Sequence, residues 1–422
     1  MPKIYIVDVT NRDGVQTSRL GLAKLEKTII NIYLNEMGVF QTEFGFPYTH
    51  HEINYIRANL ELAERGELQP IRLGGWCPMR KQEIELAFSE TPLQHVNLSI
   101  STSLQMTEGK FSGRVVRTPE DNPQAPNLID IMQENVRLAR ERGALTIGVN
   151  AEDASRTDDA FLLRFAAAAR EAGADRFRYC DTLGYDSPMT IYRRCRMLAE
   201  EIGLPIELHC HNDLGMAVAS SVMGAKGALD GGVDAYINTA INGMGERAGN
   251  ADLTSVILAV TKSSGLADTY PLDENIDLSK AWKLARYASY AFGVPIPINQ
   301  VGVGDNAFAH ECGIHADGAL KDRRNYELYN YEELGRGDPE IIDTGRQITC
   351  GEYSGIKGFR DVYGRLEIEF HDDDEARHIL ELVRFANVHT QKPLTNSELR
   401  FIAKYPDLAQ QVMTMSPPGS QP

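Results

Sequence analysis

The segment "PIELHCHNDLGMAVA", residues 205–219, contains one complete example of the structural unit that decides the fold. Its first part is a short apolar run of strand length, and its last part is a helical run of small and apolar residues after a polar turn. Residues i and i+2 of a strand point to the same face, so His209 and His211 direct two imidazoles at one point. The segment predicts a strand, a turn and a helix, with a candidate divalent-metal site where the strand ends.

The same unit is repeated along the chain before residue 270. Eight strands that alternate with helices are typical of a closed (β/α)8 barrel, whereas open doubly wound sheets are usually shorter. We therefore expect an α/β protein with a TIM barrel over residues 1–270. Besides the segment above, the predicted strands are residues 3–9, 40–46, 70–76, 95–101, 144–150, 175–181 and 233–240.

The pattern changes after residue 270, where helical segments and extended crossings replace the regular alternation. Residues 271–345 predict a linker and a helical subdomain, and residues 346–422 predict a smaller, mostly helical C-terminal subdomain. Its last segment, "SPPGSQP" at residues 416–422, has the composition of a disordered tail.

The composition limits the classes of partner. A formal net charge of −16 and a pI near 5.2 disfavour binding to nucleic acid or to an anionic membrane, because both need a dense basic patch. The six cysteines form no C-x-x-C pair, and no apolar run has the length of a membrane span. Since no signal peptide is recognisable either, we expect a cytoplasmic protein.

Polar residues gather where the predicted strands end. Active sites of TIM barrels lie at the C-terminal ends of the strands, so these side chains are expected to share one rim. In chain order they are Arg12 and Asp13, Glu43, Glu152 with Asp153 and Arg156, Asp181 and Thr182, His209 and His211, and Glu246 with Arg247 and Asn250.

Two imidazoles and one carboxylate suit Zn²⁺, Mn²⁺, Co²⁺ or Mg²⁺ and leave coordination positions open for a substrate. Asp13 is the carboxylate we expect, although Asp8 is close to it in the sequence. An H-x-H step in a strand is more often two ordinary histidines than a ligand pair. Its position at the end of strand seven, opposite the acidic turn after strand one, favours the metal site here.

Seven longer motifs occur in a fixed order: "DVTNRDGVQ", "TEFGFP", "EDASR", "CDTLG", "ELHCHNDLGMA", "NGMGERAGN" and "HECGIHADG". Together they resemble the metal-dependent TIM-barrel acyltransferases that include homocitrate, isopropylmalate and citramalate synthases. The segments "FRYCDTLG" and "GIHADGALKDRRNYE" are most similar to homocitrate synthases associated with nitrogen fixation. The resemblance covers nearly the whole chain.

This resemblance implies a metal site and its contacts with a 2-oxo acid. Asp13, His209 and His211 would hold the divalent metal, with Asn250 in or beside the ligand shell. Arg12 would face the keto oxygen of the 2-oxo acid.

The resemblance also implies residues around the metal. Thr182 would contact the carboxylate of the 2-oxo acid, and we place Arg156 and Glu152 in the same substrate site. His315 and Tyr326 would come from the subdomain after the barrel, which in this family reaches over a neighbouring chain. A homodimer is therefore implied.

The expected chemistry is a Claisen condensation with acetyl-CoA. A metal chelated by the 2-oxo acid polarises its ketone, and a general base removes a methyl proton from acetyl-CoA. We assign the base to His315, tuned by Glu43 or Glu152. Charge that develops on the former keto oxygen would be stabilised by the metal and Arg12, and thioester hydrolysis would release CoA.

Several of these residues have simpler explanations. Glu43 is equally expected as a structural partner of Arg12, and Thr182 as a turn or helix cap. His315 lies beyond the eighth strand, so only the resemblance places it at the site. Asn250, in a glycine-rich segment that is a weak pattern by itself, has the same ambiguity.

The substrate is the open question. Overall likeness favours 2-oxoglutarate, which gives homocitrate; oxaloacetate, giving citrate by Re-type addition, is the alternative, followed by the isopropylmalate and citramalate reactions. Pro78 and Met106 occupy positions where related enzymes have histidines. The long loop after strand four carries Lys110, Arg114 and Arg117, which would cover anionic CoA or a dicarboxylate.

Two other classes of function share part of this pattern. An acyl-CoA lyase would share the barrel and the metal site, but the cysteine-bearing glycine loop of that group is missing from the sequence. A non-catalytic regulatory barrel would have lost its ligands, and the expected ligands are present.

Overall fold

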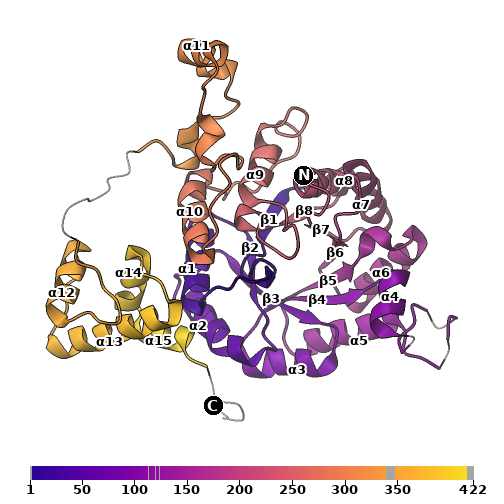
Figure 1. The fold of residues 1–422 in the computed structure, drawn as a ribbon. Helices are drawn as coiled ribbons and strands as arrows, with labels where there is room; N and C mark the ends of the chain where they lie inside the picture. The colour runs from indigo at the N-terminus through magenta and orange to yellow at the C-terminus, as the bar shows by residue number, and fades with distance from the viewer. Residues whose placement is uncertain (1, 113, 119, 123, 339–346, 416–422) are drawn as a thin grey trace.

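The computed structural model describes residues 2–112, 114–118, 120–122, 124–338 and 347–415. Eight parallel strands form a closed barrel in the order β1 to β8, with β1 paired to β8 (Figure 1). The TIM-barrel prediction is confirmed. The strands are β1 (Ile4–Asp8), β2 (Gln41–Gly45), β3 (Arg72–Pro78), β4 (His95–Ser101), β5 (Thr146–Glu152), β6 (Arg176–Asp181), β7 (Ile206–Cys210) and β8 (Ala235–Thr239).

Helices follow each strand and cover the outside of the barrel (Figure 1). Helix starts obey local rules: Ser103, Asn127, Asp158, Ser187 and Asp252 each cap a helix by accepting a backbone N–H. The helices are α1 (Lys24–Glu36), α2 (Ile53–Glu64), α3 (Lys81–Glu90), α4 (Leu104–Phe111), α5 (Leu128–Glu141), α6 (Asp159–Ala172), α7 (Pro188–Ile202), α8 (Ala217–Asp230) and α9 (Leu253–Lys262).

The interior of the barrel is unusually polar. Such interiors are normally filled by branched apolar side chains, but here Arg178 on β6 contacts Glu43 on β2, and Arg176 on β6 contacts Gln41 on β2. Strands β2 and β6 lie on opposite sides of the ring, so these side chains meet across its centre. The apolar core instead lies between the strands and the outer helices.

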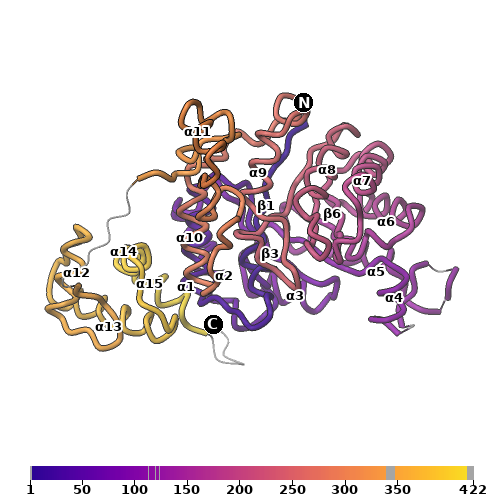
Figure 2. The backbone as a smooth tube through the Cα atoms, turned by 45° about the horizontal axis from the view of Figure 1, so that its top comes forward, coloured from indigo at the N-terminus to yellow at the C-terminus, as the bar shows by residue number. Residues whose placement is uncertain are grey.

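The C-terminal helices pack on the outside of the barrel against α1 and α2, as Figures 1 and 2 show. Tyr33 of α1 hydrogen-bonds to Ser397 at 2.6 Å, and Lys392 forms a 3.0 Å ion pair with the buried Glu26 of α1. The helices are α12 (Ile356–Arg365), α13 (Asp373–Thr390), α14 (Asn396–Lys404) and α15 (Pro406–Met413). The predicted tail, residues 416–422, lies outside the described residues.

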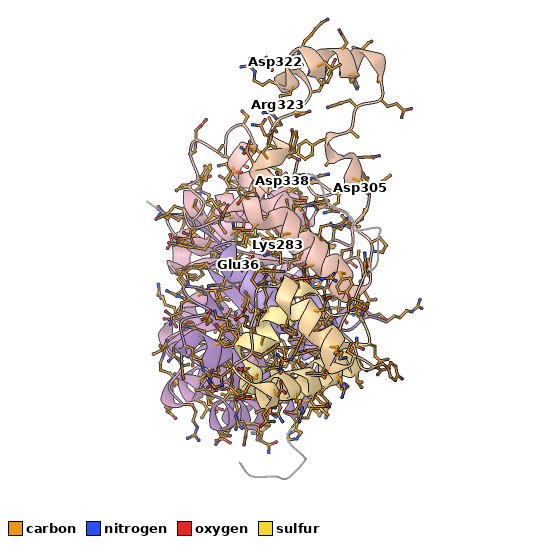
Figure 3. The ribbon with its side chains drawn as sticks, turned by 90° about the vertical axis from the view of Figure 1, so that its left-hand side faces the viewer. Glu36, Lys283, Asp305, Asp322, Arg323 and Asp338 are labelled. Carbon is orange, nitrogen blue, oxygen red and sulfur yellow. The ribbon has the colours of Figure 1, made fainter. Side chains whose placement is uncertain are left out.

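A separate arm follows α10 (Ala281–Phe292). Its outermost helix is α11 (Gly313–Lys321), which stands away from the barrel in Figures 1 and 2. Figure 3 places Asp322 and Arg323 at the far end of this arm and Asp305 and Asp338 closer to the body. Across the described part of the chain, no helix has both the length and the apolar character needed to cross a membrane.

Candidate active site

Asp13, His209 and His211 come together at the C-terminal end of the barrel. The ligand atoms that they offer lie within 4.8 Å of one another, and all three side chains are buried. His209 is in β7 and His211 directly follows it, so the i, i+2 spacing directs both rings to one side, with centroids 4.9 Å apart. Asp8 does not belong to this group; one of its oxygens accepts the Thr10 N–H at 2.9 Å.

The donor set fits a divalent cation. The Nδ1 atoms of His209 and His211 are buried and have no hydrogen-bond partner among the described residues. Burial lowers the pKa of both imidazoles, which keeps them neutral, as ligands must be. Although burial opposes it, the Arg12 guanidinium lowers the pKa of Asp13, so its carboxylate stays charged. Nitrogen and oxygen donors of this kind suit Mn²⁺, Zn²⁺, Co²⁺ or Mg²⁺.

Asn250 lies beside the metal group and holds Asp13. Its Nδ2 donates to Asp13 Oδ2 at 2.5 Å and to the Met244 carbonyl at 3.0 Å. A β-bridge between His211 and Asn250 brings the two backbones together. Gly245 makes room for this contact: its φ is 157°, and a Cβ there would lie 2.1 Å from Asn250 Nδ2. The glycine-rich segment therefore has a specific packing role.

Arg12 is fixed from two sides. Its Nε donates to Glu43 at 2.8 Å and its Nη1 donates to Asp13 at 3.0 Å. The remaining nitrogen, Nη2, has no acceptor among the described residues. Glu43 is fully buried behind Arg12, which agrees with the expectation that it is a structural partner of that arginine.

A hollow of about 190 Å³ lies over the metal group. Among its walls are the predicted residues Arg12, Thr182, Glu152 and Arg247. The Thr182 hydroxyl accepts the Asp153 N–H at 2.9 Å, which leaves its own O–H to donate. Arg247 pairs with Asp213 at 2.9 Å on the rim of the hollow.

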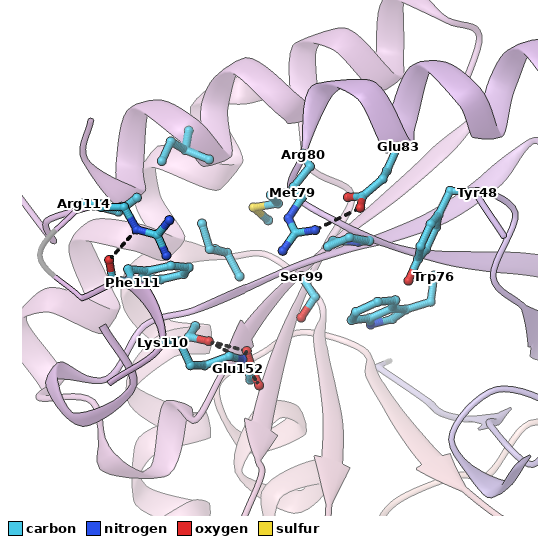
Figure 4. A pocket seen from close by; sticks show the side chains of 15 residues that line it. Tyr48, Trp76, Met79, Arg80, Glu83, Ser99, Lys110, Phe111, Arg114 and Glu152 are labelled. Carbon is cyan, nitrogen blue, oxygen red and sulfur yellow. Dashed lines mark hydrogen bonds and ion pairs between the residues drawn. The ribbon is translucent and has the colours of Figure 1, made fainter. Parts of the chain in front are cut away.

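A larger cavity of about 700 Å³ adjoins the hollow and shares Trp76, Ser99 and Glu152 with it. In Figure 4 the guanidiniums of Arg80 and Arg114 extend over this cavity, with the Lys110–Glu152 pair on one side and Trp76 on another. Lys110 and Glu152 are 2.7 Å apart.

Three further residues that the sequence singled out near the substrate lie in or beside this region. Pro78 lines the larger cavity, and Met106 lies in α4 without lining either cavity. Arg117 points elsewhere, because it pairs with Asp158 at 2.5 Å and stacks on Phe161.

Three other predicted residues do not reach the hollow of this chain. Arg156 forms a two-nitrogen contact with Asp153 at 2.7 to 2.9 Å, which occupies its guanidinium away from the hollow. His315 and Tyr326 are on the arm, with ring centroids 4.5 Å apart, and both are exposed. The structure brings these two together on the arm, whose helix α11 stands away from the barrel (Figure 1).

Sequence reasoning did not single out several residues of the wall. Trp76, Ser99, Asn150 and Arg178 line the hollow, and Asn150 Oδ1 is buried with no partner among the described residues. All four lie in strands whose alternation could have indicated that they point inward. What they meet there follows only from closure of the barrel.

Comparisons with known proteins agree with these features. The sequence profile described as HMGL-like matches residues 3–287, and the profile described as homocitrate synthase post-HMGL domain-like matches residues 303–390. The chain is 59% identical to "Citrate (Re)-synthase" of Dehalococcoides mccartyi over 99% of both chains. It is 36% identical to "2-isopropylmalate synthase 2" of Caldanaerobacter subterraneus, over 94% of both, and 31% identical to "Homocitrate synthase 1" of a Nostoc species, over 96% and 98%.

A solved structure gives the same architecture at low sequence identity. Hydroxymethylglutaryl-CoA lyase of Pseudomonas aeruginosa has a TM-score of 0.55 at 15% identity, over 70% of this chain and 95% of the other. At this identity the likeness concerns the fold alone. From the profile match over the barrel and the near full-length relatives, the chain belongs to the HMGL-like family, in a form that continues into a homocitrate synthase post-HMGL domain.

Proposed function

We propose that this protein condenses acetyl-CoA with oxaloacetate and hydrolyses the thioester, giving citrate by addition to the Re face. The observation that carries the proposal is the 59% identity with a protein named citrate (Re)-synthase, which extends over 99% of both chains. The 2-oxoglutarate reaction that overall likeness favoured receives less support, because the homocitrate synthase named above is 31% identical. Oxaloacetate, the alternative substrate in the sequence analysis, is thus preferred to 2-oxoglutarate.

The metal would be held by Asp13, His209 and His211, with Asn250 orienting Asp13 rather than acting as a ligand. A divalent cation bound there supplies Lewis acidity to the ketone of a chelating 2-oxo acid. Arg12 presents Nη2 beside this site, so it is placed to stabilise negative charge on the keto oxygen. The Thr182 hydroxyl has a free O–H for the adjacent carboxylate.

The second carboxylate of oxaloacetate would extend away from the metal. His209 and His211 lie in and directly after β7, and β3 is opposite β7 in the ring. The wall from β3 to β5 carries Trp76, Ser99 and Asn150, of which the last two are short hydrogen-bonding side chains. A turned Asn150 amide presents Nδ2 in place of the unpartnered Oδ1, so this wall suits a carboxylate close to the ketone.

Acetyl-CoA would occupy the larger cavity. Arg80, Lys110 and Arg114 outnumber Glu83 and Glu152 in its lining, which leaves one net positive charge on a chain whose net charge is −16, and CoA carries several phosphate charges. The shared wall of Trp76, Ser99 and Glu152 lets the thioester end reach the hollow.

The base would be His315 of a second copy, paired with Tyr326. In one chain these residues are exposed on an arm that stands clear of its own barrel. The arm also exposes Ile314, Leu320 and Leu328 by 74%, 89% and 74%, an apolar surface that a homodimer would cover. His315 would take the methyl proton, the resulting enolate carbon would bond to the ketone carbon, and water would then release CoA.

The test is CoA release from acetyl-CoA with oxaloacetate, 2-oxoglutarate, 2-oxoisovalerate or pyruvate, with and without a chelator that Mn²⁺ can reverse. We expect chelator-sensitive turnover with oxaloacetate first. His211→Asn should abolish it, whereas His371→Asn, at a side chain that is 90% exposed, should not. Labelled acetyl-CoA and a citrate-cleaving enzyme of known stereospecificity then decide the face. Faster turnover with 2-oxoglutarate would assign the homocitrate reaction to this protein instead. No CoA release with any of the four acids would show that the proposed condensation is wrong.

A further inference from the structure

Five buried charges form a column through the barrel interior next to the hollow. In order they alternate in sign: Arg12, Glu43, Arg178, Glu207 and Arg176. The nitrogen–oxygen distances that join successive members are 2.8, 2.5, 2.5 and 3.5 Å. No member exposes more than 7% of its side chain. A buried charge is costly unless it is paired, so each charge in the column depends on its neighbours.

Arg178 is the central member. Its Nη2 lies 2.5 Å from a carboxylate oxygen of Glu43 on β2 and 2.5 Å from one of Glu207 on β7. Its Nε has no hydrogen-bond partner among the described residues. One nitrogen atom of this side chain therefore holds two carboxylates that come from different strands.

Glu43 divides its two oxygens between Arg12 and the barrel interior. Oε2 accepts from Arg12 Nε, and Oε1 accepts from Arg178 and from Asn97 Nδ2 at 2.7 Å. The position of the carboxylate is thus set by Arg178 and Asn97, and the carboxylate in turn sets the plane of the Arg12 guanidinium. With Nε and Nη1 occupied, this plane decides where Nη2 points.

We propose that Arg178 is a positioning residue, which acts through Glu43 to direct the Arg12 guanidinium at the reacting keto oxygen. The inference rests on the proposed condensation for the identity of the substrate. The coupling between Arg178 and Arg12 is independent of it, because it is a property of the barrel.

The charge of Arg178 is what keeps Glu43 ionised, so that Glu43 can hold Arg12. Burial by itself would raise the pKa of Glu43, but Arg178, and after it Arg12, lowers that pKa to about 2. Without Arg178, Glu43 and Glu207 would face one buried cavity with one fewer cation, and the pKa of Glu43 would rise. Two cysteines also lie near this column, Cys77 and Cys180, and both stay neutral because burial raises the pKa of each thiol. A protonated Glu43 holds Arg12 less firmly.

The experiment compares three variants of the full-length protein: Arg178→Met, Arg178→Lys, and Arg178→Met combined with Glu207→Gln. Arg178→Met should lower kcat about 10- to 100-fold, the effect of displacing a reacting group, and change the KM for acetyl-CoA little. Arg178→Lys should recover much of kcat, since a single nitrogen serves both carboxylates. The double variant removes the surplus carboxylate, so it should fold well and keep the low kcat.

The double variant separates positioning from a structural role. If Arg178 only neutralises Glu207, the double variant will have the kcat of the wild type, and the proposal is wrong. A wild-type kcat in Arg178→Met would overturn it as well. The pH dependence of kcat gives a second test. The kcat of the double variant should fall at low pH as Glu43 takes up a proton, in a pH range where the kcat of the wild type is constant.

A measurement that needs no turnover tests the positioning role of Arg178 separately from the proposed reaction. Arg12 Cζ lies 5.7 Å from the Trp76 ring, so Trp76 fluorescence reports on Arg12 once the other tryptophan is removed by Trp282→Phe. Arg178→Met should add a pH transition that the matched protein lacks. If that transition appears but the wild type releases no CoA, only the proposed reaction fails. If the wild type is active and the transition and the kcat effect are both absent, only the positioning role fails.

Discussion

Asn250 donates a hydrogen bond to Asp13 across 237 positions of sequence, with its Nδ2 2.5 Å from Asp13 Oδ2. The contact ties the segment between β8 and α9 to the turn after β1 and fixes the one carboxylate of the metal group. It leaves Asp13 Oδ1 to Arg12, at 3.0 Å, so both the metal ligand and the arginine depend on it.

Asn250→Ala should therefore weaken divalent-metal binding about 10- to 100-fold, the usual cost of losing a group that orients a ligand. Titration of the metal-free protein with Mn²⁺ by calorimetry measures this directly. Asn122→Ala, at an exposed loop position, is the matched control. An unchanged dissociation constant would mean that Asp13 is held without Asn250.

Asp8 should reduce stability at neutral and alkaline pH. Burial raises its pKa to about 7 from an ordinary value of 3.8, and Oδ2 has no hydrogen-bond partner among the described residues. Between these two values the folded protein binds more protons than the unfolded chain, so the free energy of unfolding falls as pH rises toward 7. Asp8→Asn does not titrate and should raise that free energy by about 1 to 3 kcal/mol at pH 8.

Urea unfolding at pH 5 and pH 8 measures the effect of Asp8→Asn. The gain should be smaller at pH 5, where Asp8 is already protonated in the folded state. Asp268→Asn, at an exposed position, should give no such difference. An equal gain at both pH values would contradict a buried carboxyl that titrates near neutrality.

Lys110 should contribute to the binding of acetyl-CoA rather than of the 2-oxo acid. It lines the larger cavity but not the metal hollow, and its side chain is half exposed. Lys110→Met should raise the KM for acetyl-CoA about two- to fivefold, the scale of an exposed charge interaction, and salt should reduce the difference.

Steady-state kinetics with each substrate varied in turn checks this prediction for Lys110. Lys404→Met, which removes a similarly exposed lysine from the C-terminal bundle, should leave both KM values unchanged. A larger rise in the KM for oxaloacetate would instead assign Lys110 to the diacid.

The arm should act on a partner's barrel. His315→Ala keeps an intact barrel and should lose about 100- to 10,000-fold in kcat as a general base is removed. His211→Ala keeps an intact arm and should also be inactive. Mixing the two variants under conditions that exchange subunits should restore about a quarter of wild-type activity, since half of the dimers are mixed and each has one complete site. No recovery would show that the arm does not complete a neighbour's site.

Much of this protein was determined by local pattern. The spacing of His209 and His211, the polar turn with Arg12 and Asp13, and eight strand–helix repeats required only the period of a strand and the rule that barrel sites lie at strand ends. Motif order then indicated the family. These features are local, so a single sequence carries them.

Tertiary structure decided which distant side chains meet. Nothing in the sequence pairs Arg178 with Glu43, 135 positions away. The strand period says that a residue faces inward, but the ring closure and its register decide what lies opposite it. The polar interior and the division into two cavities follow from that closure, because they are contacts between strands far apart in the chain. The exposure of His315 follows from the position of the arm, which stands away from the barrel.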